Sequence, residues 1–502
     1  MRLARTRVLL TALAGALLLS SCTDDAGGDS SGSPTDAVVT VGLAAQPANL
    51  DFTTSAGAAI PQALLTNVYE KLVTVDQEGK IVGQLATDWQ LSDDRLTYTF
   101  TLAKDVTFSN GADFTAQDAV FSINRVKSDW TTSLKKSMDV VKQATAVDDH
   151  TLEVTLSRPS NGWLYAMTTR VGAMFDTDGV ADLATKPVGT GPYAVATWNK
   201  GDSLTLKRRD DYWGEKPYFA TAVLKYFKDG TALNNAMLTG TVNVVGTVQA
   251  PESLAQFGDA DRFKIIEGTT NGEVVLSMNN SKAPFNDKRV RKAVRHALDR
   301  QALVDTCWAG YGEMIGSMVP PTDPWYEDLT GVAPYDPAQA KKLLAEAGQP
   351  KPTVRLRVPN LPYAVSCGQV VQSQLSAVGF TVKLDQLEFP AAWLSAVFTN
   401  KDYEMSIVSH VEPRDLPAVF GDPQYYTAYD NADVQAAIEA ADSGTEEEQT
   451  AKMKEAARLI SEDAAADWLF LLPNLTVADP DIEGLPTNAV GEELDLTALR
   501  RS

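Results

Sequence analysis

Residues 353–384 read TVRLRVPNLPYAVSCGQVVQSQLSAVGFTVKL, and this stretch decides the fold class. Its first six residues predict a strand, residues 368–378 predict a helix that Gly379 ends, and residues 380–384 predict a second strand. Two strands joined through a helix pair in parallel within one sheet. The sequence therefore predicts a lobe of the α/β class.

Helical and strand patterns continue on both sides of this unit. Asp287 is placed to cap a helix, and the apolar residues Val290, Ala293, Val294 and Ala297 recur on one face of it. Thr115 and Asp118 form the pattern of a capping box that opens another helix. Further strands are predicted at 38–43, 96–102, 152–156 and 403–408, and further helices at 59–71, 338–347, 434–441 and 446–467.

Chain length and net charge limit the kinds of protein that this sequence can encode. The body from residue 37 to 502 is too long for one core, which predicts two or three lobes. The formal net charge is -21, and it falls to -24 when the three N-terminal arginines leave with an export signal. This charge argues against nucleic acid as a partner, because nucleic-acid binding requires a basic surface.

The first residues predict export from the cytoplasm. Arg2, Arg5 and Arg7 precede an apolar run that ends in Leu19-Ser20-Ser21-Cys22. The pattern is that of a signal peptide over 1–21, and its last four residues resemble a bacterial lipobox, which implies lipid attachment at Cys22. The alternative is an ordinary signal with an accidental cysteine. Residues 22–36 are rich in Asp, Gly and Ser and predict a flexible tether.

Two cysteines remain once Cys22 carries a lipid. Outside the cytosol such a pair persists as a disulfide, which favours a bridge between Cys307 and Cys367. Two buried free thiols, behaving as small apolar side chains, are the alternative.

Several distinctive segments follow one another along the chain. They are FSNG at 108–111, FTAQDAVF at 114–121, GTGPY at 189–193, RDDYW at 209–213, MNN at 278–280, PFNDKRVR at 284–291 and VPP at 319–321. In this order, over nearly the whole mature chain, they resemble the family 5 solute-binding proteins, the receptors of peptide and nickel ABC importers.

The resemblance implies a two-lobed α/β fold of the periplasmic-binding-protein type, with an extra domain inserted in the first lobe. The first lobe is expected at 37–80, 186–272 and 472–502, the inserted domain at 81–185, and the second lobe at 273–471. The resemblance also implies a monomer on the extracytoplasmic face of a bacterial membrane. It would capture a small solute, peptide-like by the weight of the family, and deliver it to an ABC permease.

A charged loop follows the predicted strand at 403–408. His410, Glu412, Arg414 and Asp415 would lie beyond the carboxyl end of that strand, where ligands bind in open α/β sheets. Charged groups there can hold a ligand amine and a ligand carboxylate through strong, directional hydrogen bonds. The alternative is an internal ion pair that only shapes the loop.

The family pattern is altered at this loop. The resemblance implies a carboxylate that receives a peptide ammonium, but Pro413 falls near the expected aspartate and His410 stands where many members have tryptophan. Glu412 or Asp415 would have to substitute. Leu361 also replaces the arginine that holds the peptide carboxylate in the dipeptide branch. The following Tyr363 would contact ligand or pack in the core.

A first-lobe loop is the second candidate. By resemblance, Thr53, Thr54 and Ser55 belong to a segment that touches ligand, and their small side chains suit close approach. The alternative is a plain loop that leads into a helix.

Catalytic and metal sites are not predicted. No nucleophile, base and orienting group form a recognisable set, and His150, His296 and His410 lie far apart in the sequence. No cofactor is expected. A membrane-anchored ligand sensor and a surface hydrolase remain as alternative functions.

Overall fold

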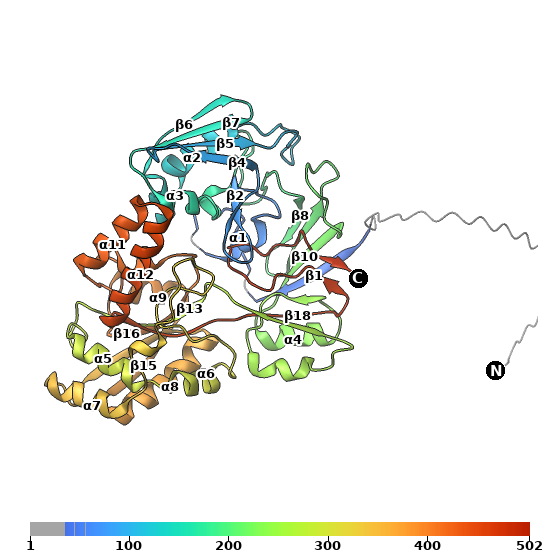
Figure 1. Cartoon of the computed structure of the whole chain (residues 1–502). Coiled ribbons are helices and arrows are strands. Elements are labelled where there is room, and N and C mark those ends of the chain that lie inside the picture. The colour runs from blue at the N-terminus through green and yellow to red at the C-terminus, as the bar shows by residue number, and fades with distance from the viewer. Residues whose placement is uncertain (1–35, 45, 56) are drawn as a thin grey trace, which may run out of the picture. The chain divides into compact units, whose positions relative to one another are not determined.

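The computed structural model describes residues 36–44, 46–55 and 57–502. The predicted signal, Cys22 and nearly all of the tether lie outside the described residues. Within them, strands form sheets of seven, five and four members and two smaller pairs (Figure 1). The larger sheets define the first lobe, the second lobe and the inserted domain, in that order.

The second lobe is built around the predicted strand–helix–strand unit. β14 (Thr353–Pro359) and β15 (Thr381–Leu387) pair in parallel, and α8 (Pro362–Val378) connects them. β16 (Met405–His410) pairs in parallel with β14 on its other side. The sheet order is β15-β14-β16-β13-β17, where β13 is Glu273–Met278 and β17 is Ala466–Leu471.

Both faces of this sheet are covered. On β13, Val274, Leu276 and Met278 belong to one hydrophobic core and Val275 to another, because successive side chains of a strand point to opposite faces. The helical elements are α5 (Lys288–Ala297), α6 (Arg300–Cys307), η4 (Thr330–Val332), α7 (Pro337–Glu346), α9 (Ala391–Trp393), η5 (Leu394–Thr399), α10 (Leu416–Phe420), α11 (Ala432–Ser443) and α12 (Glu446–Glu462).

The helix predicted from residue 287 is confirmed as α5. The Asp287 side chain accepts a hydrogen bond from Arg289 N, and the apolar face is buried. The helix predicted over 446–467 is wrong at its end, because α12 stops at Glu462, Ala464 takes a φ of 51°, and β17 follows. Every residue of β17 is buried, so its sequence shows no alternation that would mark a strand.

The first lobe holds the seven-stranded sheet, in the order β12-β18-β11-β1-β10-β9-β8. Its central strand β1 (Val38–Leu43) pairs in parallel with β10 and β11. The other strands are β8 (Tyr193–Asn199), β9 (Ser203–Arg208), β10 (Thr221–Tyr226), β11 (Val244–Val245), β12 (Lys264–Gly268) and β18 (Asn474–Ala478), and the helical elements are α1 (Ala59–Leu64), α4 (Gly230–Leu238) and η3 (Pro251–Phe257). A short pair, β19 (Ile482–Glu483) and β20 (Arg500–Arg501), joins the C-terminal segment to itself.

The helix predicted over 59–71 is shorter than expected. α1 ends at Leu64, because Leu65 is extended and Thr66 takes a φ of 63°. The chain then passes through β2 (Val73–Val75) and β3 (Ile81–Gly83), a hairpin that the expected domain boundary at residue 80 would divide.

The inserted domain is a four-stranded antiparallel sheet with helices. The order is β4-β5-β7-β6, and the predicted capping box of Thr115 and Asp118 opens α2 (Ala116–Asp129). The other elements are β4 (Ala86–Leu91), β5 (Thr97–Leu102), β6 (Val141–Asp148), β7 (Thr151–Leu156), η1 (Ser133–Met138), α3 (Asn161–Ala166) and η2 (Arg170–Gly172). The strands of all three sheets lie within the segments expected for them, and the exact boundaries stay predictions.

A glycine-rich passage leads from the inserted domain back to the first lobe. A Cβ on Gly189 would lie 2.0 Å from Val68 O, and one on Gly191 would lie 2.7 Å from Asn67 O, so two backbones touch here. Arg209 donates to the carbonyl oxygens of Gly189 and Gly191 and holds the passage in place. The GTGPY segment is therefore scaffold.

Cys307 and Cys367 form a disulfide in the structure, with their Cα atoms 5.0 Å apart. The bridge joins the end of α6 to α8 in the second lobe.

Candidate functional site

The candidate site lies at one edge of the second-lobe sheet. The carboxyl ends of β14, β15 and β16 meet at this edge because the three strands are parallel. β13 is antiparallel to β16, so its first residue, Glu273, lies opposite His410, the last residue of β16. The chain enters β13 from β12 and leaves β17 for β18, so the same edge carries the connections to the first lobe.

His410 is held in a buried hydrogen-bond chain. Its Nδ1 lies 3.1 Å from Asp415 Oδ2, and its Nε2 lies 2.9 Å from the Tyr426 hydroxyl. Tyr426 in turn contacts Ser277 Oγ at 2.6 Å, and its ring is stacked parallel to the imidazole. His410 thereby orients the Asp415 carboxylate.

Two buried carboxylates at the edge have a free oxygen. Glu273 is 1% exposed, and its Oε2 finds no hydrogen-bond partner among the described residues; neither does Oδ1 of Asp415. Burial, the Asp415 charge and weaker contributions from Asp323 and Glu412 raise the pKa of Glu273 well above its ordinary value. Burial also raises the pKa of Asp415, against the effect of its hydrogen bond to His410. We call Glu273, Glu412 and Asp415 the carboxylate site.

Arg414 makes its contacts within the protein. Its Nε donates to Asp323 Oδ1 at 3.2 Å, and its guanidinium lies over the rings of Tyr165 and Trp325, at 3.9 and 4.7 Å from their centroids. Nη2 donates to Gly79 O at 3.3 Å. Burial raises the pKa of Asp323 to about 6, although Arg414 opposes this shift. Arg414 therefore joins the second lobe to α3 and to the β2–β3 hairpin.

Glu412 and Tyr363 differ in their surroundings. Glu412 is exposed beside the buried acids. Tyr363 is buried at the start of α8, and its hydroxyl accepts a hydrogen bond from Ser409 N at 2.9 Å. This hydrogen bond joins the start of α8 to the end of β16. Tyr363 therefore packs in the core, which is one of the two roles that the sequence analysis considered for it.

The first-lobe loop satisfies its own polar groups. Thr53 is buried, and both its N and its Oγ1 donate to Asp51 Oδ1, at 2.9 and 2.6 Å. Thr54 is exposed, and Ser55 Oγ accepts a long 3.4 Å bond from Gly57 N. The structure does not bring these residues into hydrogen-bond contact with the carboxylate site, as far as the described residues show.

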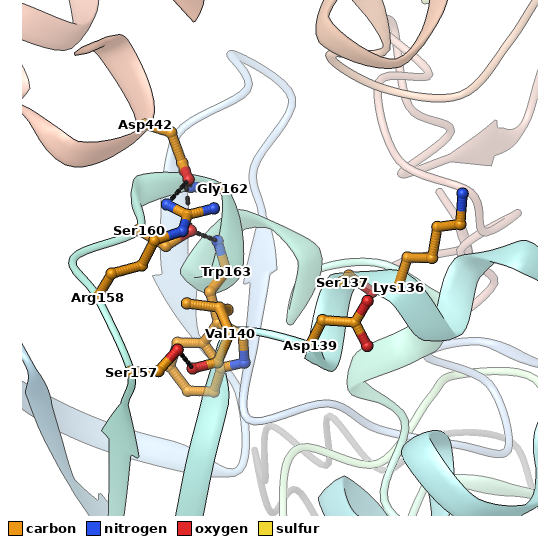
Figure 2. Close-up of a pocket in the computed structure, with 10 residues that line it drawn as sticks. All are labelled: Lys136, Ser137, Asp139, Val140, Ser157, Arg158, Ser160, Gly162, Trp163 and Asp442. Atoms are coloured by element: carbon orange, nitrogen blue, oxygen red, sulfur yellow. Dashed lines mark hydrogen bonds and ion pairs between the residues drawn. The ribbon is translucent and has the colours of Figure 1, made fainter. Parts of the chain in front are cut away.

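A second contact joins the lobes away from this edge. Asp442, near the end of α11, accepts hydrogen bonds from Arg158, from Ser160 Oγ and from Gly162 N, at 2.6, 2.8 and 2.9 Å (Figure 2). Asn161 adds two bonds to backbone oxygens at the end of the same helix. The second lobe is therefore docked onto the inserted domain in this structure.

The sequence analysis did not select Glu273, Asp323 or Tyr165. One feature of the sequence could have pointed to Glu273. It is the only charged residue in the strand EVVLSM, whose other residues are apolar or small. Asp323 and Tyr165 follow no pattern, because only tertiary folding brings them to Arg414.

Metal-ligand clusters and membrane-spanning helices are both absent from the part of the chain that the structure describes. No three His, Cys, Asp or Glu side chains in this part of the chain are grouped so as to hold a metal ion. No described helix is both long enough and apolar enough to cross a membrane.

Comparisons with known proteins identify the family and the fold to which this chain is similar. The model of the bacterial extracellular solute-binding proteins, family 5, matches residues 80–432. The glutathione-binding protein GsiB of Salmonella choleraesuis is 29% identical over 373 residues, which cover 70% of each chain. The periplasmic binding protein DppA of Helicobacter pylori, solved with the peptide STSA, superposes with a TM-score of 0.81 at 23% identity, over 93% of this chain and 98% of that one. CtaP of Listeria monocytogenes gives a TM-score of 0.83 at 22% identity, over 93% and 100%. The predicted two-lobed fold is confirmed.

Proposed function

This chain belongs to family 5 of the bacterial extracellular solute-binding proteins, and we propose that its ligand is a peptide-like molecule with a protonated amine. The protein is a binding protein and not an enzyme, and it captures a solute outside the cytoplasm for an ABC importer. Two proteins that it resembles, one named for glutathione and one solved with a peptide, support the peptide-like class.

The observation that carries this proposal is the pair of free carboxylate oxygens on Glu273 and Asp415. Burying a carboxylate without partners is unfavourable, and a raised pKa is the usual response. A ligand ammonium placed between the two groups would supply the missing hydrogen bonds as charge-assisted ones, which are the stronger kind. The site is therefore matched to a cation.

The local charge balance favours the same ligand group. Arg414 is the one cation of the loop, and it is paired with Asp323. Glu273, Glu412 and Asp415 then leave an excess of negative charge at the sheet edge. A ligand carboxylate would be repelled there, so we place it farther away, toward the first lobe.

We expect the ligand to be captured through contacts that form only when the two lobes close on it. The bonds of Arg414 to Gly79 O and of Asp442 to Ser160 and Gly162 join the second lobe to the rest of the protein through the protein's own groups. A ligand that touches both lobes adds to these contacts and shifts the population further toward the closed form.

Calorimetry with defined probes tests the ligand class. We expect trialanine to bind, and N-acetyl-trialanine to bind at least roughly 30-fold more weakly, because a buried charge then lacks its partner. Equal affinity of the free and acetylated peptides would rule out an amine site. No detectable binding of trialanine would contradict the peptide-like class.

We also propose that Cys22 carries a lipid and holds the protein, as a monomer, on the extracytoplasmic face of the cell membrane. The support is the sequence Leu19-Ser20-Ser21-Cys22 after a charged, apolar start. Cys22→Ala should release the protein from membranes or block its processing. A processed Cys22→Ala protein that stays in the membrane fraction would contradict the anchor.

A further inference from the structure

Large apolar side chains stand exposed on the segment that follows β15. Phe389 is 36% exposed, Leu394 42% and Phe398 37%. The segment includes η5, a turn of π-helix, and such turns are frequent at functional sites. Exposed apolar groups that lie together mark a binding surface, whereas single ones are ordinary.

The rings of this segment are connected by direct contacts. Phe389 and Phe398 each contact the buried Trp393, with centroids 6.1 and 6.5 Å apart. Phe398 continues to the half-buried Tyr425, at 5.3 Å and nearly perpendicular. We call these four residues the aromatic ledge.

The aromatic ledge adjoins the carboxylate site. Phe398 lies 5.6 Å from the ring of Tyr426, and that ring is also stacked with His410. Burial raises the pKa of Tyr425, and the neighbouring Tyr426, Asp415 and Glu412 raise it further. Two ring contacts thus separate Phe398 from the histidine that orients Asp415.

The start of the ledge also lies at the sheet edge of the site. The amide of Phe389 donates to Asn360 Oδ1 at 2.9 Å, just beyond the carboxyl end of β14. β14 lies between β15 and β16 in the sheet, so Phe389, just after β15, and His410, the last residue of β16, lie at the same edge of the sheet.

We propose that the aromatic ledge binds a large apolar side chain of the ligand whose amine the carboxylate site receives. This inference rests on the proposed function. An extended peptide advances about 3.3–3.6 Å per residue. With the amine at Glu273 and Asp415, we expect a side chain on one of the next residues of the peptide to meet the ledge. Phe389 and Phe398 then determine specificity, and the ligand class narrows to short peptides with an early aromatic or aliphatic residue.

The test compares two tripeptides on the full chain. Calorimetry measures binding of Ala-Phe-Ala and Ala-Ser-Ala to the parent, to Phe398→Ala, to Phe389→Ala and to Tyr335→Ala. Tyr335 is a matched control because it is 52% exposed and is not part of the ledge. Thermal unfolding by circular dichroism checks each fold, and Phe389→Ala serves if Phe398→Ala is unstable.

We expect the parent to prefer Ala-Phe-Ala by about 10-fold or more, since burying a phenylalanine side chain is strongly favourable. Each ledge variant should lose most of that preference while it still binds Ala-Ser-Ala, and Tyr335→Ala should keep it. A preference that is absent in the parent, or unchanged in both ledge variants, overturns the inference. So does a parent dimer that Phe398→Ala disperses, because a second copy would then cover the ledge. A parent that binds neither tripeptide overturns the proposed function itself.

Discussion

The two loops that the sequence selects for ligand contact satisfy their polar groups in opposite ways. In the first-lobe loop, Asp51 accepts both the backbone and the hydroxyl bonds of Thr53, and Arg170 donates to Gly57 O. In the second-lobe loop, buried carboxylate oxygens of Asp415 and of the neighbouring Glu273 have no partner in the described chain. A native protein rarely leaves such groups unpaired, and each exception calls for an explanation. We therefore propose that ligand recognition lies mainly in the second lobe.

The largest expected effect is on ligand affinity at the second loop. Asp415→Asn should weaken trialanine binding by about 2–5 kcal/mol, because it removes a charge paired with the ligand in a buried site. Asp422→Asn, which changes an exposed carboxylate in the same segment, is the control. Calorimetry measures both. If the two variants bind alike, the comparison between the loops fails.

Glu273→Gln should stabilise the ligand-free protein while it weakens binding. The folded pKa of Glu273 is raised above its ordinary 4.5, so the unfolded chain ionises first as the pH rises. Glu273 therefore destabilises the fold progressively between about pH 4.5 and its raised pKa. Glutamine removes this destabilisation. We expect the free energy of unfolding to increase by about 1–3 kcal/mol at pH 8 and to change little at pH 4.

Urea unfolding at the two pH values measures this effect. A Glu273→Gln protein that is less stable than the parent at pH 8 would show that the carboxylate already has a partner in the folded chain.

Arg414→Ala should open the ligand-free protein. Arg414 takes a φ of 54°, an unfavourable conformation for a residue other than glycine, and its contacts with Tyr165, Trp325 and Gly79 compensate for that cost. We expect the free energy that favours the closed over the open form to fall by about 1–2 kcal/mol. Small-angle X-ray scattering should show a larger radius of gyration than the parent has, and added trialanine should restore part of the difference. Identical scattering of both proteins would mean that Arg414 only shapes its loop.

The smallest effect is expected in the first-lobe loop. Thr54 is exposed and makes only long 3.4 Å contacts to Asp51, so Thr54→Ala should change trialanine affinity by less than about 0.5 kcal/mol. A loss comparable to that of Asp415→Asn would show that both lobes share recognition equally.

Local patterns predicted most of the fold and only part of the site. The capping box at Thr115, the helix after Asp287 and the strands around α8 depend on neighbours in sequence, and each is found in the structure. β17 was missed because a strand buried on both faces shows no alternation.

Within the site, His410 and Asp415 are predictable because they lie at, or shortly after, the end of a strand. Glu273 joins them only through the antiparallel pairing of β13 with β16, which lies far along the chain. The partners of Arg414 come from three separate segments, so its spacing to Glu412 and Asp415 gave no indication that it is already paired.

The most direct test of the account counts the protons released when a peptide binds. At pH 6 the amine of trialanine is already protonated, since α-amino groups titrate near 7.7–8.0. An ammonium at the carboxylate site should lower the raised pKa values of Glu273 and Asp415 and release protons. Calorimetry in buffers of different ionisation enthalpy measures this release. The account predicts release from the parent and much less from Glu273→Gln; equal heats in every buffer, or proton uptake, would contradict it.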